Sequence, residues 1–426
     1  MLLEASYGDN VNMRSYIRNR LIILSVCFCM LVVTYFMVNQ REQEVEKSLQ
    51  ETGNIKETQV DRPFQPFQNP FGENGKRQAL SNDRIEQERK KIILTYGEVL
   101  GHQYWWDTPH DFDFYEKDGT PCEYRHCKLV YDEFNYIRIA DAVLFHGQDM
   151  PSHKQLKSLD KIPLMQLWIW MTSESPAGFS NLKSLDSYRH VFNWTATYRL
   201  DSDIWTPHFI VQPLPHPNPP IDYSHGKTKM MIIIMSNNCK SYRTKFIKKL
   251  QKYISIDVYG KCKTEFDPNL PECSFDGDDC KVLQSKYKFT LSLESAYCTD
   301  YVTEKFYYNG LMIGNIPVTM NRGKMSDPKV APPNSFVNIL DFENVETLAN
   351  HLKKIASSDK LYNQFHAWRQ NFKLGTKNRM CSICEALWKR DLKGLKGEKK
   401  IDFDKEWSYE KDCVSYEHHM FNKYLE

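Results

Sequence analysis

The chain has 426 residues, of which 41% are hydrophobic and 13% aromatic, enough to bury two cores of ordinary size rather than one. Its 56 Lys and Arg residues almost balance its 54 Asp and Glu residues. This balance argues against the class of nucleic-acid binders that use a broadly basic surface to displace counterions. Any anion that the protein binds must therefore be held by a local arrangement of groups.

The first predicted element is a membrane anchor. Residues 21–38 carry no charge, and at about 1.5 Å per helical residue this length is just enough to cross a bilayer core. Arginines precede the segment and mixed charges follow it, so the positive-inside rule keeps the N-terminus in the cytosol. A cleaved signal peptide is the alternative, but no small-x-small cleavage site follows the apolar run. We expect a single-pass type II protein with residues 1–20 as its cytosolic tail.

Residues 39–89 are rich in Gln, Glu, Asn and Pro and poor in aliphatic side chains. Such a composition cannot offset the entropy cost of ordering the chain. We expect a flexible stem here, which would tether a globular head to the membrane.

An N-terminal domain is predicted over residues 90–222. Three apolar runs, at 92–96, 141–147 and 164–171, are typical of buried strands. Five prolines follow between residues 213 and 223. Because proline cannot take part in regular ladders, these residues favour a hinge between two domains.

A C-terminal domain is predicted over residues 223–392. Apolar strand patterns alternate there with amphipathic helix patterns, which indicates a parallel sheet with right-handed crossovers. Ligands of such sheets bind beyond the carboxyl ends of the strands. Residues 393–426 form a lysine-rich tail, which we expect at the periphery. The strands are expected at 229–236, 254–260, 287–294 and 315–320, and the helices at 243–253, 303–314 and 345–372.

The loop after the first of these strands ends in Arg243, at the start of a helix. Free backbone N–H groups at a helix start favour an anion, and an arginine adds a bidentate donor for phosphate. Neither a GxGxxG nor a GxxxxGK[ST] pattern is present, so no dinucleotide or P-loop signature supports this site. Arg243 as an ordinary surface residue is the alternative.

The sequence DYVTEKF places Glu304 and Lys305 in a first helical turn that Thr303 can cap. Glu304 is explained by the helix dipole alone. A lysine at this position opposes the dipole, which makes most sense if it shares the N–H groups of the turn in holding an anion.

Glu174 follows an aromatic strand in the sequence WIWMTSESP. A carboxylate at the carboxyl end of a buried strand is placed as a catalytic base would be, partly desolvated so that its pKa can rise. A solvated turn residue is the alternative.

Ten cysteines lie in the part of the chain predicted to be lumenal, an even number that suits disulfides in an oxidising compartment. Cys381 and Cys384, in CSIC, would otherwise be half a zinc site or a redox pair. Asn193 is in the only N-x-S/T sequon and is a candidate for glycosylation. The disulfide candidates are Cys122, Cys127, Cys239, Cys262, Cys273, Cys280, Cys298, Cys381, Cys384 and Cys413.

Together these stretches resemble the family 10 glycosyltransferases, the α1,3-fucosyltransferases, in a form similar to nematode and other invertebrate members. The resemblance covers nearly the whole head, from about residue 90 to residue 390, and DYVTEKF is its most specific mark. The matching stretches, in chain order, are ESP, FNWTATYRLDSDIWTPH, MSNNCKSYR, IDVYGKC, DYVTEKFYYNGLMIGNIPV, APPNSF, FHAWR and CSIC.

The resemblance implies a GT-B fold, in which two Rossmann-like domains face each other across a cleft. Arg243 and Lys305 would hold the diphosphate of GDP-fucose, Glu304 the ribose, and Tyr301 the nucleotide. Glu174 would be the general base of a single inverting displacement. The acceptor would be a GlcNAc hydroxyl in a glycan of a glycoprotein or glycolipid.

The resemblance also implies a Golgi membrane protein with a lumenal catalytic head. No metal site and no tightly bound cofactor are expected, with Mn²⁺ as an optional stimulator, so the acidic residues 275–279 are interpreted as a solvated loop. Cys381 and Cys384 would pair with each other or with Cys122 and Cys127. The oligomeric state is left open.

Two departures from the family pattern concern substrates. Ser295 and Ala296 stand where many members have Asn and Ser, and Ser295 has the shorter reach toward donor phosphates. Ala177 and Gly178 replace a histidine that is frequent after ESP, which leaves acceptor preference open. The alternatives to an active fucosyltransferase are a lumenal homologue that binds GDP-fucose or glycans without turnover and a transferase of another nucleotide sugar.

Overall fold

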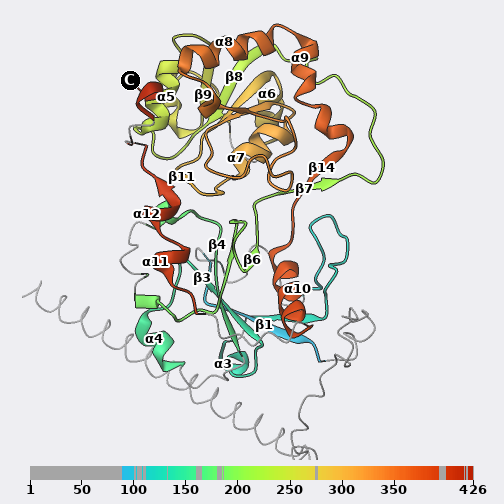
Figure 1. Ribbon diagram of the computed structural model, residues 1–426, viewed down its shortest axis with the longest axis vertical. Helices are drawn as coiled ribbons and strands as arrows, with labels where there is room; N and C mark the ends of the chain where they lie inside the picture. The colour runs from blue at the N-terminus through green and yellow to red at the C-terminus, as the bar shows by residue number, and fades with distance from the viewer. Residues whose placement is uncertain are drawn as a thin grey trace, which may run out of the picture. The chain divides into compact units, whose positions relative to one another are not determined.

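The residues that the computed structural model describes all lie within one compact unit, residues 80–426 (Figure 1). The predicted tail, the predicted anchor and all but residue 89 of the predicted stem lie outside the described residues. Within the described part of the chain, no helix is both long and apolar enough to span a bilayer. The described residues are 89–99, 102, 108, 112–131, 133–159, 166–179, 185, 187–273, 277–392, 400–416, 418 and 421–425.

The first sheet is parallel and has the strand order β2-β1-β3-β4-β5-β6. Strands form at all three predicted apolar runs, and β3 is buried at every position. Such strands are apolar on both faces because helices and loops cover both sides of a parallel sheet. The strands are β1 (Lys91–Tyr96), β2 (Cys127–Val130), β3 (Ala142–His146), β4 (Leu167–Thr172), β5 (Trp194–Thr197) and β6 (Ile204–Trp205), with α3 (Glu133–Tyr136), α4 (His153–Ser158) and the 3₁₀ turn η2 (Pro176–Gly178) between them.

The second sheet is also parallel, with the order β13-β12-β10-β8-β9. Its strands β8 (Lys229–Ile234), β9 (Ile256–Tyr259), β10 (Tyr287–Ser292) and β12 (Ile316–Thr319) form within the four predicted stretches, and β13 (Val337–Asn338) is added at the edge. These two sheets confirm the predicted α/β class with two Rossmann-like sheets. The helices and turns are α5 (Tyr242–Leu250), η4 (Lys261–Glu265), α6 (Asp278–Ser285), α7 (Glu304–Phe306), the π-helix η5 (Tyr307–Met312), η6 (Ile339–Asp341), α8 (Val345–Ala356), α9 (Asp359–Gln364) and η7 (Ala367–Gln370).

Local sequence explains why α8 begins where it does. Asn344 accepts a hydrogen bond from the backbone N–H of Thr347, and the Thr347 hydroxyl in turn accepts one from the N–H of Asn344. This reciprocal cap satisfies two donors that the first turn leaves free. The apolar face of α8, with Leu348 and Leu352 fully buried, packs into the core of the second sheet.

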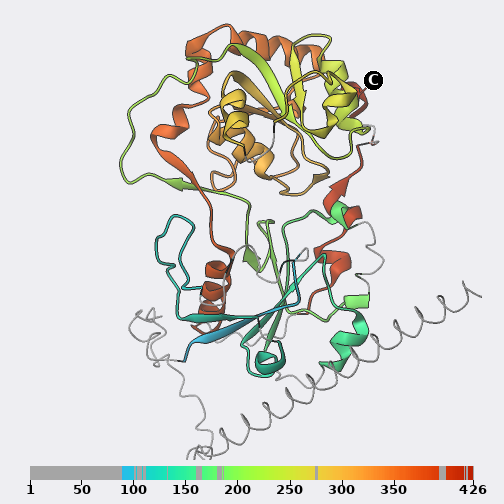
Figure 2. The ribbon, with the colours of Figure 1, turned by 180° about the vertical axis from the view of Figure 1, so that it is seen from behind.

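The chain passes from the second sheet back to the first near residue 376, which the predicted domain boundaries missed. The antiparallel pair β7 (Ile210–Pro213) and β14 (Phe372–Gly375) brings the outgoing and returning segments together. Helix α10 (Arg379–Leu392) then packs into the core of the first sheet, and Figure 2 shows it from behind, beside the strands. The predicted C-terminal domain should therefore end before α10.

The expectation of a peripheral C-terminal tail is wrong. Ile401, Phe403 and Trp407 are buried among aromatic residues of the first core, and Tyr424 is buried in the second. The many lysines of the tail favoured an exposed segment, but the apolar residues between them pack against the two cores. The tail forms α11 (Phe403–Glu406), α12 (Tyr409–Asp412), β15 (Cys413–Val414) and α13 (Asn422–Leu425), and β15 pairs with β11 (Tyr297–Cys298).

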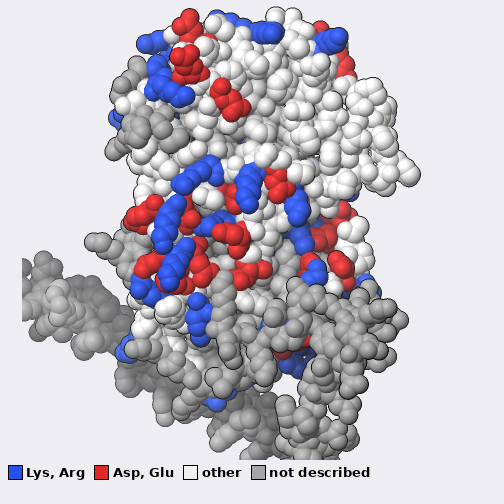
Figure 3. All heavy atoms as spheres, viewed as in Figure 1, with Lys and Arg blue, Asp and Glu red and all other residues white. Residues whose placement is uncertain are grey.

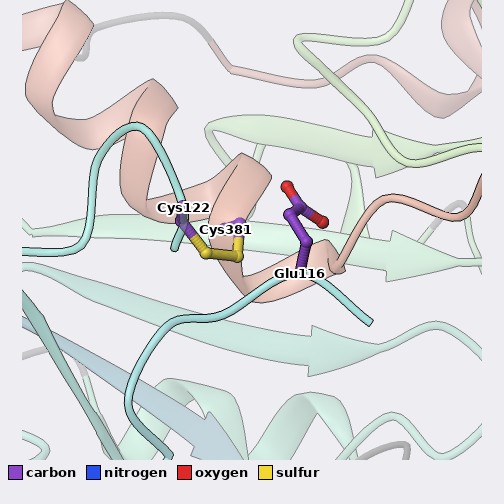
Figure 4. A group of neighbouring side chains, drawn as sticks. All are labelled: Glu116, Cys122 and Cys381. Carbon is purple, nitrogen blue, oxygen red and sulfur yellow. A yellow bond between two sulfur atoms is a disulfide. The ribbon is translucent and has the colours of Figure 1, made fainter. Parts of the chain in front are cut away.

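All ten candidate cysteines form disulfides, which confirms that prediction and decides the pairing. In CSIC, Cys381 and Cys384 do not pair with each other, so neither a redox pair nor a zinc half-site is present. Figure 4 shows Cys381 bonded to Cys122, with Glu116 beside them. The Glu116 carboxylate accepts a hydrogen bond from the N–H of Asn378, just before α10. The pairs are Cys122–Cys381, Cys127–Cys384, Cys239–Cys262, Cys273–Cys280 and Cys298–Cys413.

Two surface predictions have different outcomes. Asp278 and Asp279 are exposed, as predicted, but they lie in the first turn of α6 and not in a loop. The helix dipole favours them there, and Asp278 pairs with Lys281. Asn193 is only 6% exposed, and its side-chain oxygen accepts a hydrogen bond from the N–H of Trp168. The folded protein therefore does not present Asn193 for glycosylation, and we withdraw that site.

The distribution of charge agrees with the small net charge. On the face in Figure 3, basic and acidic side chains alternate across the middle of the molecule, and no broad patch of one sign is visible. This face supports the argument against counterion-driven binding of nucleic acids.

Candidate functional site

Glu174 lies in a loop that is fixed from two sides. Its backbone N–H donates to the Thr172 hydroxyl at the end of β4, 3.1 Å away. The preceding residue, Ser173, is held by its carbonyl, 3.2 Å from Nε2 of His208, and by its hydroxyl, which accepts from Nη2 of Arg379 at 3.1 Å. A partly buried carboxylate therefore projects from a rigid turn at the carboxyl end of a buried strand.

His208 and Arg379 were not identified from the sequence. Burial, followed by the charge of Arg379, lowers the pKa of His208 to about 4, so the ring is neutral at neutral pH and its Nε2 donates to the Ser173 carbonyl. Burial also lowers the pKa of Arg379 to about 10, which still leaves it charged. Arg379 is the first residue of α10, and disulfides from Cys381 and Cys384 hold this end of the helix against the first sheet.

Tyr301 connects the loops of the two sheets. It follows β11, and its hydroxyl donates to Oε2 of Glu174 at 2.9 Å. Burial and then the charge of Glu174 raise the pKa of Tyr301, so the hydroxyl keeps its proton and acts as a donor. The structure thus places Tyr301 on the candidate base, a contact that the sequence did not predict.

Thr303 caps α7 as predicted, and Lys305 lies between two carboxylates. The Thr303 hydroxyl accepts from the N–H of Lys305. Nζ of Lys305 is 2.8 Å from Oε1 of Glu304 and 3.3 Å from Oε2 of Glu294. Burial alone would lower the pKa of Lys305, but the two carboxylates outweigh it and raise the pKa. Lys305 is therefore a fixed cation at the start of a helix.

Glu294 is a further residue of the candidate site that was not identified from the sequence. Its side chain is 1% exposed and accepts hydrogen bonds from the N–H and the hydroxyl of Thr303, both at 2.8 Å. Burial raises the pKa of Glu294. The charge of Lys305 lowers it, but the effect of burial is larger. The signal was available, because Glu294 follows β10 in the way that Glu174 follows β4, and the same strand-end argument applies to both.

Arg243 and Ser295 lie in neighbouring parts of this edge. Arg243 is 4% exposed and its Nη2 donates to the carbonyl of Asn237 at 2.5 Å, so it is not an ordinary surface residue. Ser295 is exposed and lines a cavity of about 550 Å³ that Ala177 also lines. Among the described residues Arg243 has no hydrogen bond or ion pair with Glu304 or Lys305. The cavity is lined both by Ala177, which follows the loop of the candidate base, and by Ser295, which follows β10.

The arrangement has the parts needed for transfer to a hydroxyl group. A carboxylate lies at the end of one parallel sheet, and a fixed lysine lies in a first helical turn beside the end of the other. A carboxylate can accept a proton from an attacking hydroxyl. A preorganised cation stabilises a leaving group that gains negative charge.

Two buried neutral histidines should make the protein less stable in mild acid. Burial lowers the pKa of His208 to about 4, and burial with the charges of Arg369 and Lys227 lowers that of His366 to about 3. Because an unfolded histidine titrates near 6.5, the unfolded state binds these protons first and stability falls as the pH drops below that value. We expect a loss of roughly 2 kcal/mol per histidine in the free energy of unfolding between pH 7 and pH 5.

Denaturant titrations of the parent protein, His208→Gln and His366→Gln at the two pH values measure this loss. Each variant should lose less stability than the parent over the same interval, because glutamine does not titrate. Equal losses in all three proteins would contradict the assignment.

Two protein-family models match the chain. "Fucosyltransferase, N-terminal" matches residues 88–209, and "Glycosyltransferase family 10 (fucosyltransferase) C-term" matches residues 224–401. The first match contains Glu174 and the second contains Arg243 and Lys305.

The chain is also similar to individual proteins. It is 32% identical over 250 residues to "Alpha-(1,3)-fucosyltransferase 7" of Rattus norvegicus, covering 58% of this chain and 63% of the rat protein. It is 32% identical over 267 residues to "3-galactosyl-N-acetylglucosaminide 4-alpha-L-fucosyltransferase FUT3" of Bos taurus, covering 62% and 69%. A solved structure, "Crystal Structure of alpha1,3-Fucosyltransferase", aligns with a TM-score of 0.46 at 12% identity over 76% of this chain and 95% of that one. The match thus spans less than two thirds of the rat relative.

Proposed function

Because the chain belongs to glycosyltransferase family 10, the fucosyltransferases, we propose that it transfers fucose from GDP-fucose to a GlcNAc hydroxyl of a glycan. The linkage formed is α1,3, and the anomeric configuration is inverted. The observation that carries the proposal is the placement of Glu174. It is held in a fixed loop at the end of β4 and is bonded to Tyr301 from the loop that leads into the Lys305 helix.

In the proposed reaction Glu174 accepts the proton of the attacking hydroxyl. The acceptor oxygen forms a bond to the anomeric carbon of fucose while the bond from that carbon to the phosphate oxygen breaks, and GDP leaves with the electron pair. Oε2 of Glu174 accepts from the Tyr301 hydroxyl, and the remaining lone pairs of the carboxylate can accept from the acceptor hydroxyl. The base then holds the proton at the end of the step.

Lys305 and Arg243 are proposed to stabilise the departing diphosphate. Negative charge grows on the leaving group in the transition state, so cations there lower the barrier more than they strengthen ground-state binding. Glu304 is assigned to the ribose and Ser295 to the donor. Glu294 is a positioning residue, since it holds both Thr303 and Lys305.

The remaining features of the proposal follow the family pattern. The two parallel sheets are assigned to a GT-B arrangement with the donor on the second sheet, and the protein is assigned to the Golgi membrane with residues 21–38 as its anchor. No resident metal is assigned, and stimulation by Mn²⁺ is left to experiment.

Incubating the purified full-length chain with GDP-fucose and acceptors tests the function. The acceptors should be N-acetyllactosamine, LacdiNAc and N-glycan cores, with product detected by mass spectrometry and the linkage determined by NMR. Transfer of fucose to the 3-hydroxyl of GlcNAc is expected for at least one of them. Binding of GDP-fucose without transfer to any acceptor would instead indicate the non-catalytic alternative.

A further inference from the structure

A second cavity lies at the opposite end of the second sheet from the candidate donor residues. It has a volume of about 610 Å³, and we call it the hinge cavity because the two segments that connect the sheets form its walls. Its lining residues are 218–221, 223, 312, 360, 363, 364, 366–370 and 372–374.

The position of α9 shows which end of the sheet this is. The hydroxyl of Tyr362 in α9 donates to the carbonyls of Lys288, at the start of β10, and Gly314, just before β12. Glu294 and Ser295 follow the other end of β10. Six strand residues at about 3.3 Å each separate the two ends by nearly 20 Å, so the hinge cavity is distinct from the candidate donor site.

Arg369 is the central charge of the hinge cavity. Its guanidinium lies 4.7 Å from the ring centre of Tyr223 and 4.3 Å from that of Trp368. Its Nη2 donates to the carbonyl of Leu311 and its Nε to Nδ1 of His366. Among the described residues no carboxylate pairs with Arg369. A largely buried charge is normally paired, because leaving water costs several kcal/mol.

The surroundings of Arg369 are also positive. Lys360 and Lys373 line the hinge cavity, and its described lining residues include no Asp or Glu. Burial and then the charge of Arg369 lower the pKa of Lys227, which lies behind the wall, to about 7. Two acidic groups near the cavity are hydrogen-bonded to other residues: Asp222 accepts from Ser224 and Asn363, and Asp118 accepts from Thr120. Among the described residues, the lining of the cavity therefore contains cations and no carboxylate.

The uncharged residues that line the hinge cavity indicate which groups, besides a negative charge, a ligand of this cavity should carry. Four residues with side-chain amides line the cavity together with aromatic rings. The Asn363 amide is already bonded to Asp222 and to the N–H of Tyr223, and the Asn218 amide donates to the carbonyl of Arg369. Among the described residues this leaves the amides of Gln364 and Gln370, each with two donors and an acceptor, for a ligand. Amides suit hydroxyl groups and aromatic faces suit the apolar faces of sugar rings. The amides are those of Asn218, Asn363, Gln364 and Gln370.

We propose that the hinge cavity binds an acidic sugar, meaning a saccharide with a carboxylate or sulfate group, and that Arg369 is its anion contact. Lys360 and Lys373 add charge at the exposed rim, and the amides of Gln364 and Gln370 bind the hydroxyls. The inference rests on the proposed function only in choosing a saccharide as the ligand class. The site would hold an acidic branch of a glycan apart from the hydroxyl that receives fucose.

The test measures binding of 6-sulfo-N-acetyllactosamine to the full-length chain without GDP-fucose, with unsulfated N-acetyllactosamine as the neutral comparison. The sulfated sugar should bind more tightly than the neutral one. Because a charge-assisted contact is lost, Lys360→Glu combined with Lys373→Glu should weaken its binding by about tenfold or more. Both lysines are exposed, so the double variant should fold, and Lys329→Glu at another exposed site is the matched control.

Arg369→Lys tests the central contact, with thermal melting as the check on folding. Equal binding of the two sugars, or unchanged binding in the Lys360 and Lys373 double variant, would overturn the proposal. So would displacement of the sulfated sugar by GDP, which would make the cavity a nucleotide site.

Turnover of N-acetyllactosamine is measured on the same variants. Failure of the proposed function would appear as no turnover with charge-dependent binding intact, and failure of this inference as normal turnover with no such binding.

Discussion

Glu174→Gln is expected to lower kcat by roughly 10² to 10⁴-fold, the usual contribution of a general base. Glutamine keeps the shape of the side chain and can still accept a hydrogen bond from Tyr301, but it cannot take the proton of the attacking hydroxyl. The affinity for GDP should not change, because no described contact links Glu174 to Lys305 or Arg243. Steady-state kinetics and calorimetric titration with GDP measure the two effects separately.

Glu410→Gln, at an exposed position of α12, is the matched control and should keep parental activity. Tyr301→Phe provides a second comparison, because it removes the hydrogen bond to Glu174 without removing the base. If Glu174→Gln retains full turnover, another group must be the base and the proposed mechanism is wrong.

Lys305→Ala is expected to reduce kcat/KM by roughly 100-fold, about 3 kcal/mol, by analogy with the loss of one preorganised oxyanion donor. Two effects act in the same direction. The variant loses the cation, and it also leaves the carboxylates of Glu294 and Glu304 facing the incoming diphosphate. GDP should bind more weakly, in contrast to Glu174→Gln.

Combining Lys305→Ala with Glu294→Gln separates these two effects. The double variant removes one of the two carboxylates that lose their lysine, so it should recover part of the GDP affinity if repulsion contributes. Lys324→Ala, at an exposed position outside the cluster, is the control. GDP affinity and turnover that are both unchanged in Lys305→Ala would reject a role for this lysine at the phosphates.

The candidate site shows how far local sequence arguments reach. Glu174 and Lys305 were proposed because strand ends and helix starts are recognisable along the chain, and these positions concentrate ligand contacts in parallel sheets. Glu304 fitted the helix dipole alone, and its proposed role came from the family resemblance. The same argument applied to Glu294 and was not made, although the residue ends a strand in the same way. Arg379 could not be found by this argument, because it lies far from Glu174 in the sequence and meets Ser173 only through the return of α10 to the first sheet.

The cysteines show a similar division. Their even number and the predicted lumenal position were sufficient to predict disulfides. The spacing of Cys381 and Cys384 left two pairings open, and packing of α10 beside β2 decided between them. The sequon at Asn193 was misleading, because a tripeptide does not show whether its asparagine is buried. In the fold the Asn193 side chain accepts a hydrogen bond from the N–H of Trp168 in β4.

The two parallel sheets and the family could be predicted from the order of residues, because apolar runs of strand length, alternating helix patterns and ordered motifs are local properties of the chain. Tertiary structure alone decided that Tyr301 bonds Glu174, that Glu294 holds Lys305, and that the C-terminal residues complete both cores. These contacts join residues that are distant in the chain or whose side-chain directions depend on packing. Burial and charge pairing, which set the chemistry of the site, are properties of the folded surroundings and are not encoded at any single position.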